Sequence, residues 1–236
     1  MAAISLRTEL LRLAVPLVKT HGFTREALAQ SALRLPEPHK EPLSEAAVTS
    51  IFGSGDDARR TLIQAWMEAA VLNMKSKSTP PSLLELLESR LKWNEPVLGH
   101  LPEAFALLAT PKFSSLLPLD PSVAVRHNIH IANEACNLVG SHDIGVRRHL
   151  PLESRADVSC ITGQLAWHRK RAAAAIAYAA AELVQLAQPE SPDVPYKVLK
   201  QQLDRSQKAL QSVEEVGLFG QYVARSWAGI GKSMGL

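Results

Sequence analysis

The sequence predicts an all-α protein, and three observations carry that prediction. Apolar residues recur at the 3.6-residue period of amphipathic helices through most of the chain. Alternating patterns typical of strands are nearly absent. The stretch from Ala172 to Ala181 has no polar side chain except the Tyr178 hydroxyl, which is typical of a helix enclosed by other helices. We therefore expect a bundle of about ten helices around a central helix at residues 163–186.

Size and composition allow a folded core without crosslinks. The 236 residues suffice for one large domain, and apolar residues make up 46% of them while aromatic residues make up only 5%. The net charge of +3 indicates no particular polyanionic partner. Cys136 and Cys160 show no metal-ligand spacing. No apolar run approaches the roughly 18–20 residues of a membrane span, and the residues show no clear transit peptide.

Residues 1–78 are expected to form a helix-turn-helix-like N-terminal part. Apolar periodicity predicts a first helix that ends before Gly22, two short helices at 25–32 and 45–52, and a longer one at 56–77. A Thr or Ser that can cap the helix precedes each short helix. Three prolines between the two short helices predict a loop there.

The segment His-Gly-Phe-Thr-Arg-Glu-Ala-Leu-Ala at 21–29 resembles the helix-turn-helix entry of TetR-type transcription regulators. The sequence therefore predicts a TetR-like fold. In such regulators the third helix reads DNA, but residues 44–51 carry one acid and no Lys or Arg. Phosphate contacts need cations, and the proline loop lengthens a turn that recognition motifs keep short. We expect no nucleic-acid partner, and a ligand-sensing TetR-type regulator is the alternative function.

Residues 79–188 are expected to form a ligand-binding helical bundle. Leucine-rich and apolar patterns predict helices at 82–92, 103–110 and 121–139 before the central helix. The stretch 141–162 is mixed in charge and has no clear helical period, so it is expected to be an irregular surface loop.

The central helix begins with an aromatic and cationic cluster. Trp167 and His168 directly precede Arg169, Lys170 and Arg171, near the helix end where cations are disfavoured. A large aromatic beside clustered cations is typical of an interface hot spot. The alternative is that Trp167 packs in the core and the cations are solvated.

Residues 189–236 are expected to be a proline-rich linker and two helices, the last at 216–234. One narrow side of the last helix is apolar and the opposite side is basic. This amphipathic pattern suits a membrane interface, with packing on the protein core as the alternative. The apolar stripe consists of Val216, Phe219, Val223, Trp227, Ile230 and Met234.

Motifs of common enzymes are missing. The sequence has no phosphate-cradling glycine loop, no Gly-x-Ser-x-Gly, no His-Glu-x-x-His and no Glu-x-x-His. The best metal candidate is the set His127, His130 and Glu134, which shares a helix face at loose spacing. A metal-dependent enzyme through these residues is an alternative, but we expect neither an enzyme nor a catalytic or metal site.

Several short motifs, in order along nearly the whole chain, resemble one family. That family is the accessory lipid-binding proteins of mitochondrial ubiquinone (coenzyme Q) biosynthesis, the ninth of the COQ proteins, in a fungal version. The motifs are His-Gly-Phe-Thr-Arg-Glu-Ala-Leu at 21–28, Ser-Ile-Phe-Gly at 50–53, Leu-Pro-Glu-Ala-Phe-Ala-Leu-Leu-Ala-Thr-Pro at 101–111, Trp-His-Arg-Lys-Arg-Ala at 167–172, Ala-Ala-Glu-Leu at 180–183 and Arg-Ser-Trp-Ala-Gly at 225–229.

The resemblance implies a TetR-like fold without DNA binding and without a cofactor. Such proteins bind isoprenoid quinone intermediates as ligands in an apolar pocket. They lie peripherally on the matrix face of the mitochondrial inner membrane, through the last helix, and tend to form homodimers. They present the lipid to the di-iron demethoxyubiquinone hydroxylase within the ubiquinone biosynthetic complex.

The resemblance also implies site residues. The family's partner-binding patch is a Trp-Tyr pair followed by basic residues; it corresponds here to Trp167, to His168 in place of the Tyr, and to Lys170 and Arg171. The family's membrane helix corresponds to residues 216–234. Where the family has a short Gly-Asp loop before the Trp, this chain has about twenty further residues, up to Cys160.

Overall fold

A computed structural model describes the backbone of residues 2–76, 82–110, 122–147, 159–206 and 208, and the side chains of 6–76, 82–110, 122–139, 167–206 and 208. Of the interpretable residues, 85% are helical and none lies in a strand. The all-α prediction is therefore confirmed, and the described residues form eight α-helices of eight residues or more rather than about ten. The apolar stripe of residues 216–234 lies outside the described residues.

The elements follow one another along the chain as α-helices joined by short 3-10 turns and loops. Helix α1 continues through a 3-10 turn into α2, and a second 3-10 turn follows α3. Their bounds are α1 Ala2–Ala14, η1 Val15–Leu17, α2 Val18–His21, α3 Arg25–Gln30, η2 Ser31–Arg34, α4 Glu45–Phe52 and α5 Asp56–Lys75. The remaining elements are α6 Leu83–Asn94, η3 Glu95–His100, α7 Leu101–Ala109, α8 Ser122–Arg147, α9 Ser159–Ala187 and a helix at 193–206.

Local capping explains where several helices begin. The Thr24 hydroxyl accepts a hydrogen bond from the Ala27 N–H at 3.3 Å, which starts α3. Ser44 caps α4 in the same way. Ser82 and Glu85 form a reciprocal capping box at the start of α6. The N-cap residue of α5 is Gly55, and no side-chain hydrogen bond caps this helix.

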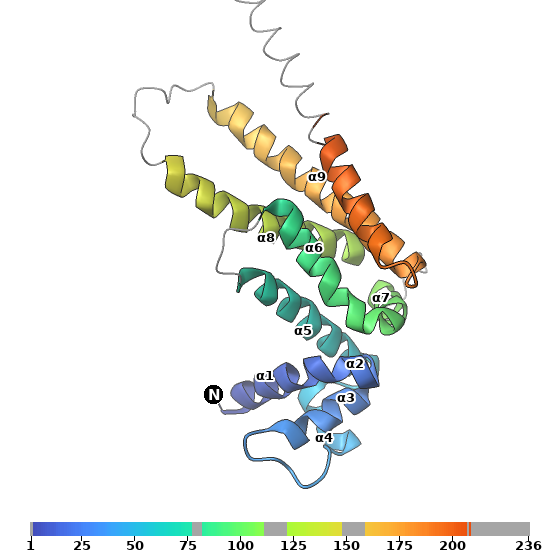
Figure 1. The fold of residues 1–236 in the computed structure, drawn as a ribbon. Coiled ribbons are helices and arrows are strands. Elements are labelled where there is room, and N and C mark those ends of the chain that lie inside the picture. Colours follow the sequence, from blue (N-terminus) through green and yellow to red (C-terminus); the bar gives the residue numbers. More distant parts are fainter. Residues whose placement is uncertain (1, 77–81, 111–121, 148–158, 207, 209–236) are drawn as a thin grey trace, which may run out of the picture.

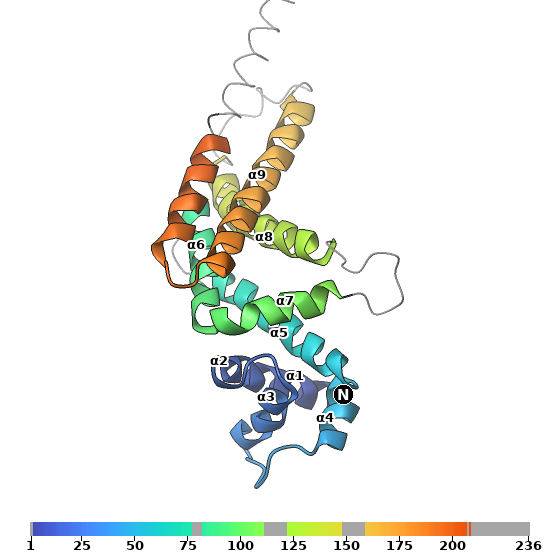
Figure 2. The same ribbon diagram turned by 90° about the vertical axis from the view of Figure 1, so that its right-hand side faces the viewer.

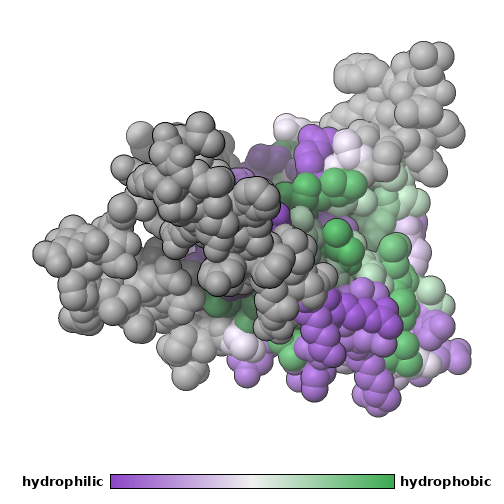
Figure 3. Space-filling model, turned by 90° about the horizontal axis from the view of Figure 1, so that it is seen from above, coloured by the Kyte–Doolittle hydropathy of each residue, from purple (hydrophilic) through white to green (hydrophobic). Residues whose placement is uncertain are grey.

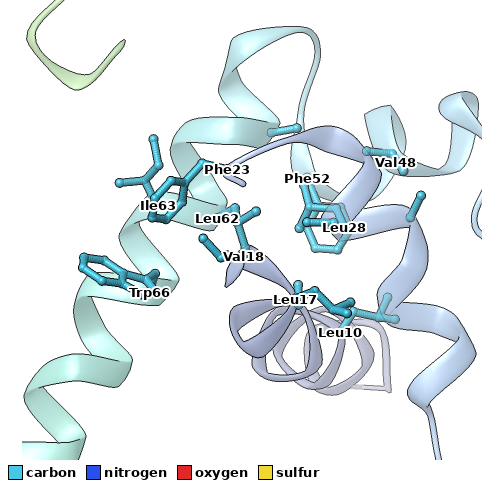
Figure 4. Close-up of a cluster of buried hydrophobic side chains, with 14 of the residues drawn as sticks. Leu10, Leu17, Val18, Phe23, Leu28, Val48, Phe52, Leu62, Ile63 and Trp66 are labelled. Carbon is cyan, nitrogen blue, oxygen red and sulfur yellow. The ribbon is translucent and has the colours of Figure 1, made fainter. Parts of the chain in front are cut away.

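A first hydrophobic core joins α1–α4 to the N-terminal half of α5 and to α7 (Figure 4). Phe23 and Trp66 meet edge to face with ring centroids 5.5 Å apart, a favourable aromatic geometry. Its other large members include Leu10, Val18, Leu28, Val48, Phe52, Leu62 and Ile63.

A second core lies between α6, α8, α9 and the helix at 193–206. Helix α5 contributes Trp66 to the first core and Met74 to the second. It runs from the α1–α4 group toward α8 (Figures 1 and 2). The two cores are therefore connected through one long helix. No described helix is long and apolar enough to cross a membrane.

Both ends of the stretch expected to be irregular at 141–162 are helical in the structure. Helix α8 continues to Arg147 and α9 begins at Ser159, which leaves only 148–158 outside the described residues. The sequence has no proline between 122 and 150, so nothing in it forces α8 to end at Gly140.

The central helix α9 is not enclosed on every side, contrary to the expectation. Ile176 and Leu183 are 66% and 67% exposed. On the adjacent α8, Val125 and Ile129 are 54% and 46% exposed. The view from above shows apolar residues reaching the surface beside hydrophilic ones (Figure 3). The Ala-rich sequence allows close packing on one side, but no described element covers the other side.

Candidate functional site

The structure places Trp167 at the surface of α9. Trp167 is 46% exposed. Its ring meets the His168 ring edge to face, with the two centroids 4.7 Å apart. The Arg171 guanidinium lies over the Trp167 ring, 3.2 Å from the centroid, a cation–π contact. Trp167 is therefore not a core residue, and three of the four predicted partner-site residues form one surface cluster. Lys170 is exposed on the same helix.

Arg171 fixes this cluster to the neighbouring helix. Its Nη1 donates to the Asn133 Oδ1 at 3.0 Å and its Nη2 donates to the Asn137 Oδ1, both on α8. Nearby, burial raises the pKa of the Cys136 thiol, although Lys170 and Arg171 lower it in part. The Trp167 ring therefore packs on a guanidinium group whose position is fixed by hydrogen bonds to α8.

A groove of about 880 Å³ opens among the described N-terminal helices. Helices α1 and α2 form one wall, α5 forms another, and α6 with η3 forms a third. Its apolar lining includes two tryptophans, Trp66 and Trp93, together with Leu11, Val15 and Leu72. Only the α6 and η3 wall belongs to residues 79–188, where the ligand-binding bundle was expected. Sequence reasoning gave no signal for this groove, because its walls come from segments far apart in the chain.

A buried polar network lies behind Trp66. Arg90 is fully buried, and its guanidinium lies 5.0 Å from the Trp66 ring and 6.0 Å from the Tyr178 ring. Its Nη1 donates to the Asn94 Oδ1, and the Asn94 amide donates to Glu182 at 3.2 Å and to Gln185 at 3.1 Å. The Tyr178 hydroxyl donates to Glu182 at 2.8 Å. The network joins α6 to α9 through hydrogen bonds.

The charges of this network shift two pKa values. Burial raises the pKa of Glu182, but His127 and Arg90 together outweigh it, so the pKa ends below its usual value. The His127 Nε2 lies 3.8 Å from the Glu182 Oε1, too far for a hydrogen bond, and acts through its charge when protonated. Burial holds the pKa of Tyr178 well above its usual value. Glu182 is therefore a buried carboxylate at neutral pH.

The structure does not bring the metal candidates together. His127 faces Glu182, His130 is exposed, and Glu134 pairs with Lys75 at 2.8 Å. Within the described residues, no group of three His, Cys, Asp or Glu side chains is placed to hold a metal ion.

In the helix-turn-helix-like part, an arginine of α3 is bound to α4 within the protein. Arg25 on α3 pairs with Glu45 on α4 at 2.6 Å and donates to the Thr49 hydroxyl at 2.7 Å. This arginine therefore holds α3 against α4 rather than facing an external phosphate. Helix α4 itself carries no Lys or Arg.

No family model and no curated protein matches the sequence.

Proposed function

We propose that this protein is a non-enzymatic lipid-binding protein that holds an isoprenoid quinone intermediate and presents it to the di-iron hydroxylase of ubiquinone biosynthesis. The observation that carries this proposal is the groove of about 880 Å³ with apolar walls. Ligand pockets of roughly 300–1,000 Å³ are mostly apolar and usually few in a protein. The resemblance of the short motifs to the ubiquinone accessory family supplies the identity of the lipid and of the partner.

The chemistry of an isoprenoid tail fits the groove's apolar lining. A tail offers no polar atoms to recognise, so its affinity comes from burial of its carbon surface, about 0.8 kcal/mol for each buried methylene. The half-buried Trp93 and the exposed Leu72 offer apolar surface for such contacts, whereas Trp66 is buried behind them. The cost of ordering the ligand offsets part of this gain.

The Trp167 cluster is the proposed contact with the hydroxylase. Trp and Arg are the residue types most enriched at binding hot spots. Arg171 is already held by Asn133 and Asn137, so the side chain loses little freedom when a partner binds. The exposed Lys170 and the His168 ring extend the same surface.

A homodimer and a membrane contact complete the proposal. The exposed apolar residues Ile176 and Leu183 on α9, with Val125 and Ile129 on α8, suit a self-complementary interface between two copies of the chain. The apolar stripe of residues 216–234 is the proposed peripheral contact with the mitochondrial inner membrane.

The lipid carried by the purified protein tests the proposed ligand. Protein isolated from its native host without detergent is extracted and its lipids are identified by mass spectrometry. We expect a quinone or quinone precursor with an isoprenoid tail. Extracts that contain no isoprenoid lipid above the level of an unrelated helical protein would contradict the proposal.

Flotation with liposomes tests the membrane contact separately. A chain that ends at residue 208 keeps both described cores and loses the apolar stripe. We expect it to remain helical and to stay in the soluble fraction, while the full chain floats with the liposomes. If the shortened chain floats equally well, the membrane contact lies elsewhere.

A further inference from the structure

The groove concentrates positive charge at its margins. Four cations and one carboxylate line it: Arg7, Arg12, Lys19 and Lys92 against Glu68. The resulting excess of three positive charges equals the net charge of the entire 236-residue chain. A second basic site at residues 197–208 has the same excess, but of these two sites the groove is the one that combines its cations with apolar side chains.

Three of these four cations have no counterion among the described residues. Arg12 pairs with Glu9 at 2.5 Å. For Arg7, Lys19 and Lys92, whose side chains are exposed, the structure has no ion pair with any described residue. A charged group that approached them would form charge-assisted contacts without breaking existing ones.

A further cation lies behind the apolar wall. Arg90 is buried, and its guanidinium lies against the Trp66 ring, which lines the groove. Its own hydrogen bond goes to the neutral Asn94 side chain, and it lies beyond ion-pair distance of Glu182. An apolar cleft with cations at its margin and behind its wall matches a molecule with an apolar body and a negative end.

From this arrangement we infer that the groove binds a single-chain amphiphile whose head carries a carboxylate or a phosphate. The chain lies along Trp93 and Leu72, and the head meets Lys19, Lys92 or Arg7. The inference rests on the proposed lipid-binding function for the tail and adds the charge of the head. Among quinones and quinone precursors with an isoprenoid tail, it favours those whose ring carries an acidic group.

Fluorescence energy transfer from tryptophan to cis-parinaric acid tests the inference with the full chain. The neutral comparison ligand is the methyl ester of the same acid. Each exposed ion contact contributes little by itself, so two or three of them together give roughly a tenfold preference for the acid over the ester. This preference falls as salt is raised, because exposed charges are screened.

Charge reversal locates the site. The variant Lys19→Glu/Lys92→Glu is expected to bind the acid at least tenfold more weakly and the ester unchanged. The matched control Lys40→Glu/Lys200→Glu makes the same change in net charge at exposed residues that do not line the groove, and should leave both affinities unchanged. Circular dichroism confirms that each variant is folded before binding is measured.

Competition identifies the head group. Displacement of cis-parinaric acid by oleate or by oleoyl lysophosphatidate, and much less by mono-oleoylglycerol, supports the inference. Equal binding of acid and ester would overturn the anionic head and leave the lipid-binding function intact. Displacement by inorganic phosphate alone, or equal weakening in the control variant, would also overturn it. If neither acid nor ester binds, the groove is not a lipid site and the proposed function fails with it.

Discussion

Replacement of Trp167 by alanine separates a partner-binding role from a packing role. Trp167 is 46% exposed and its ring is stacked on Arg171 at 3.2 Å. An exposed cation–π contact contributes about 0.5–1 kcal/mol, and the partly buried ring adds a similar amount from its apolar area. We therefore expect the free energy of unfolding to fall by about 1–2 kcal/mol, whereas a fully buried Trp would cost about 3–5 kcal/mol.

The stability measurement is thermal unfolding by circular dichroism. A loss of about 1 kcal/mol lowers Tm by roughly 2–4 °C in a chain of this size, so Trp167→Ala should lower it by roughly 2–8 °C. The matched control is Leu6→Ala, because Leu6 is also 46% exposed but lies on α1. It should have a small effect on Tm.

The binding measurement is titration with the purified di-iron hydroxylase. A hot-spot residue costs at least about 2 kcal/mol when truncated, which weakens binding roughly 30-fold. Leu6→Ala should bind like the unmodified protein. An unchanged Kd for Trp167→Ala, with the fold intact, would refute the partner site. A fall in Tm of well over 10 °C would show instead that Trp167 serves packing.

Three further predictions concern the fold itself. Folding lowers the pKa of Glu182, so its carboxylate stabilises the protein at pH values above the usual pKa of 4.5, and this stabilisation is lost as the pH falls below 4.5. Urea titrations at pH 7 and pH 4 should therefore show a smaller difference in the free energy of unfolding for Glu182→Gln than for the unmodified protein. Leu62→Ala, at a fully buried position, should lower the free energy of unfolding by about 2–5 kcal/mol. Leu72→Ala, at a position that is 64% exposed, should lower it by under about 0.5 kcal/mol. Equal losses in denaturant titrations would contradict the burial of Leu62 in the first core. Gly22→Ala should lower the free energy of unfolding by roughly 1–2 kcal/mol, because the φ of Gly22 is 65° and a Cβ there would lie 3.0 Å from a histidine side chain. At Gly99 an added Cβ would meet no atom within 4 Å, so Gly99→Ala should leave the melting curve nearly unchanged.

The helices were predictable because their signals are local. Thr24, Ser44 and Ser82 cap helices that begin at the next residue, and each capping bond spans only three residues. The all-α class follows from such signals and from the apolar period. The resemblance to the ubiquinone accessory family and the boundaries of its three expected parts stay predictions.

The buried network could not be predicted as a site, because its members lie far apart in the sequence. Asn94 reaches Glu182 and Gln185 across 88 and 91 positions. One signal was available: Arg90 and Asn94 lie four positions apart and point into a leucine-rich helix interface, where polar residues need partners. The groove had no such signal, since α1, α5 and α6 each contribute only part of its lining.

The exposed side of α9 shows what an apolar pattern leaves open. Such a pattern indicates that a face is buried, but the burial can be against the same chain or against another surface. Ile176 and Leu183 are apolar and exposed, and no described element of the chain covers them.

Mass spectrometry of the intact protein under non-denaturing conditions tests the central claim most directly. The groove variant Ala69→Trp fills the floor of the groove, and Ala46→Trp places the same side chain on the exposed side of α4. We predict one bound lipid per chain in the unmodified protein and in Ala46→Trp, and none in Ala69→Trp when circular dichroism shows it folded. The same lipid occupancy in all three proteins, or none in any, would contradict the claim that this groove holds a lipid.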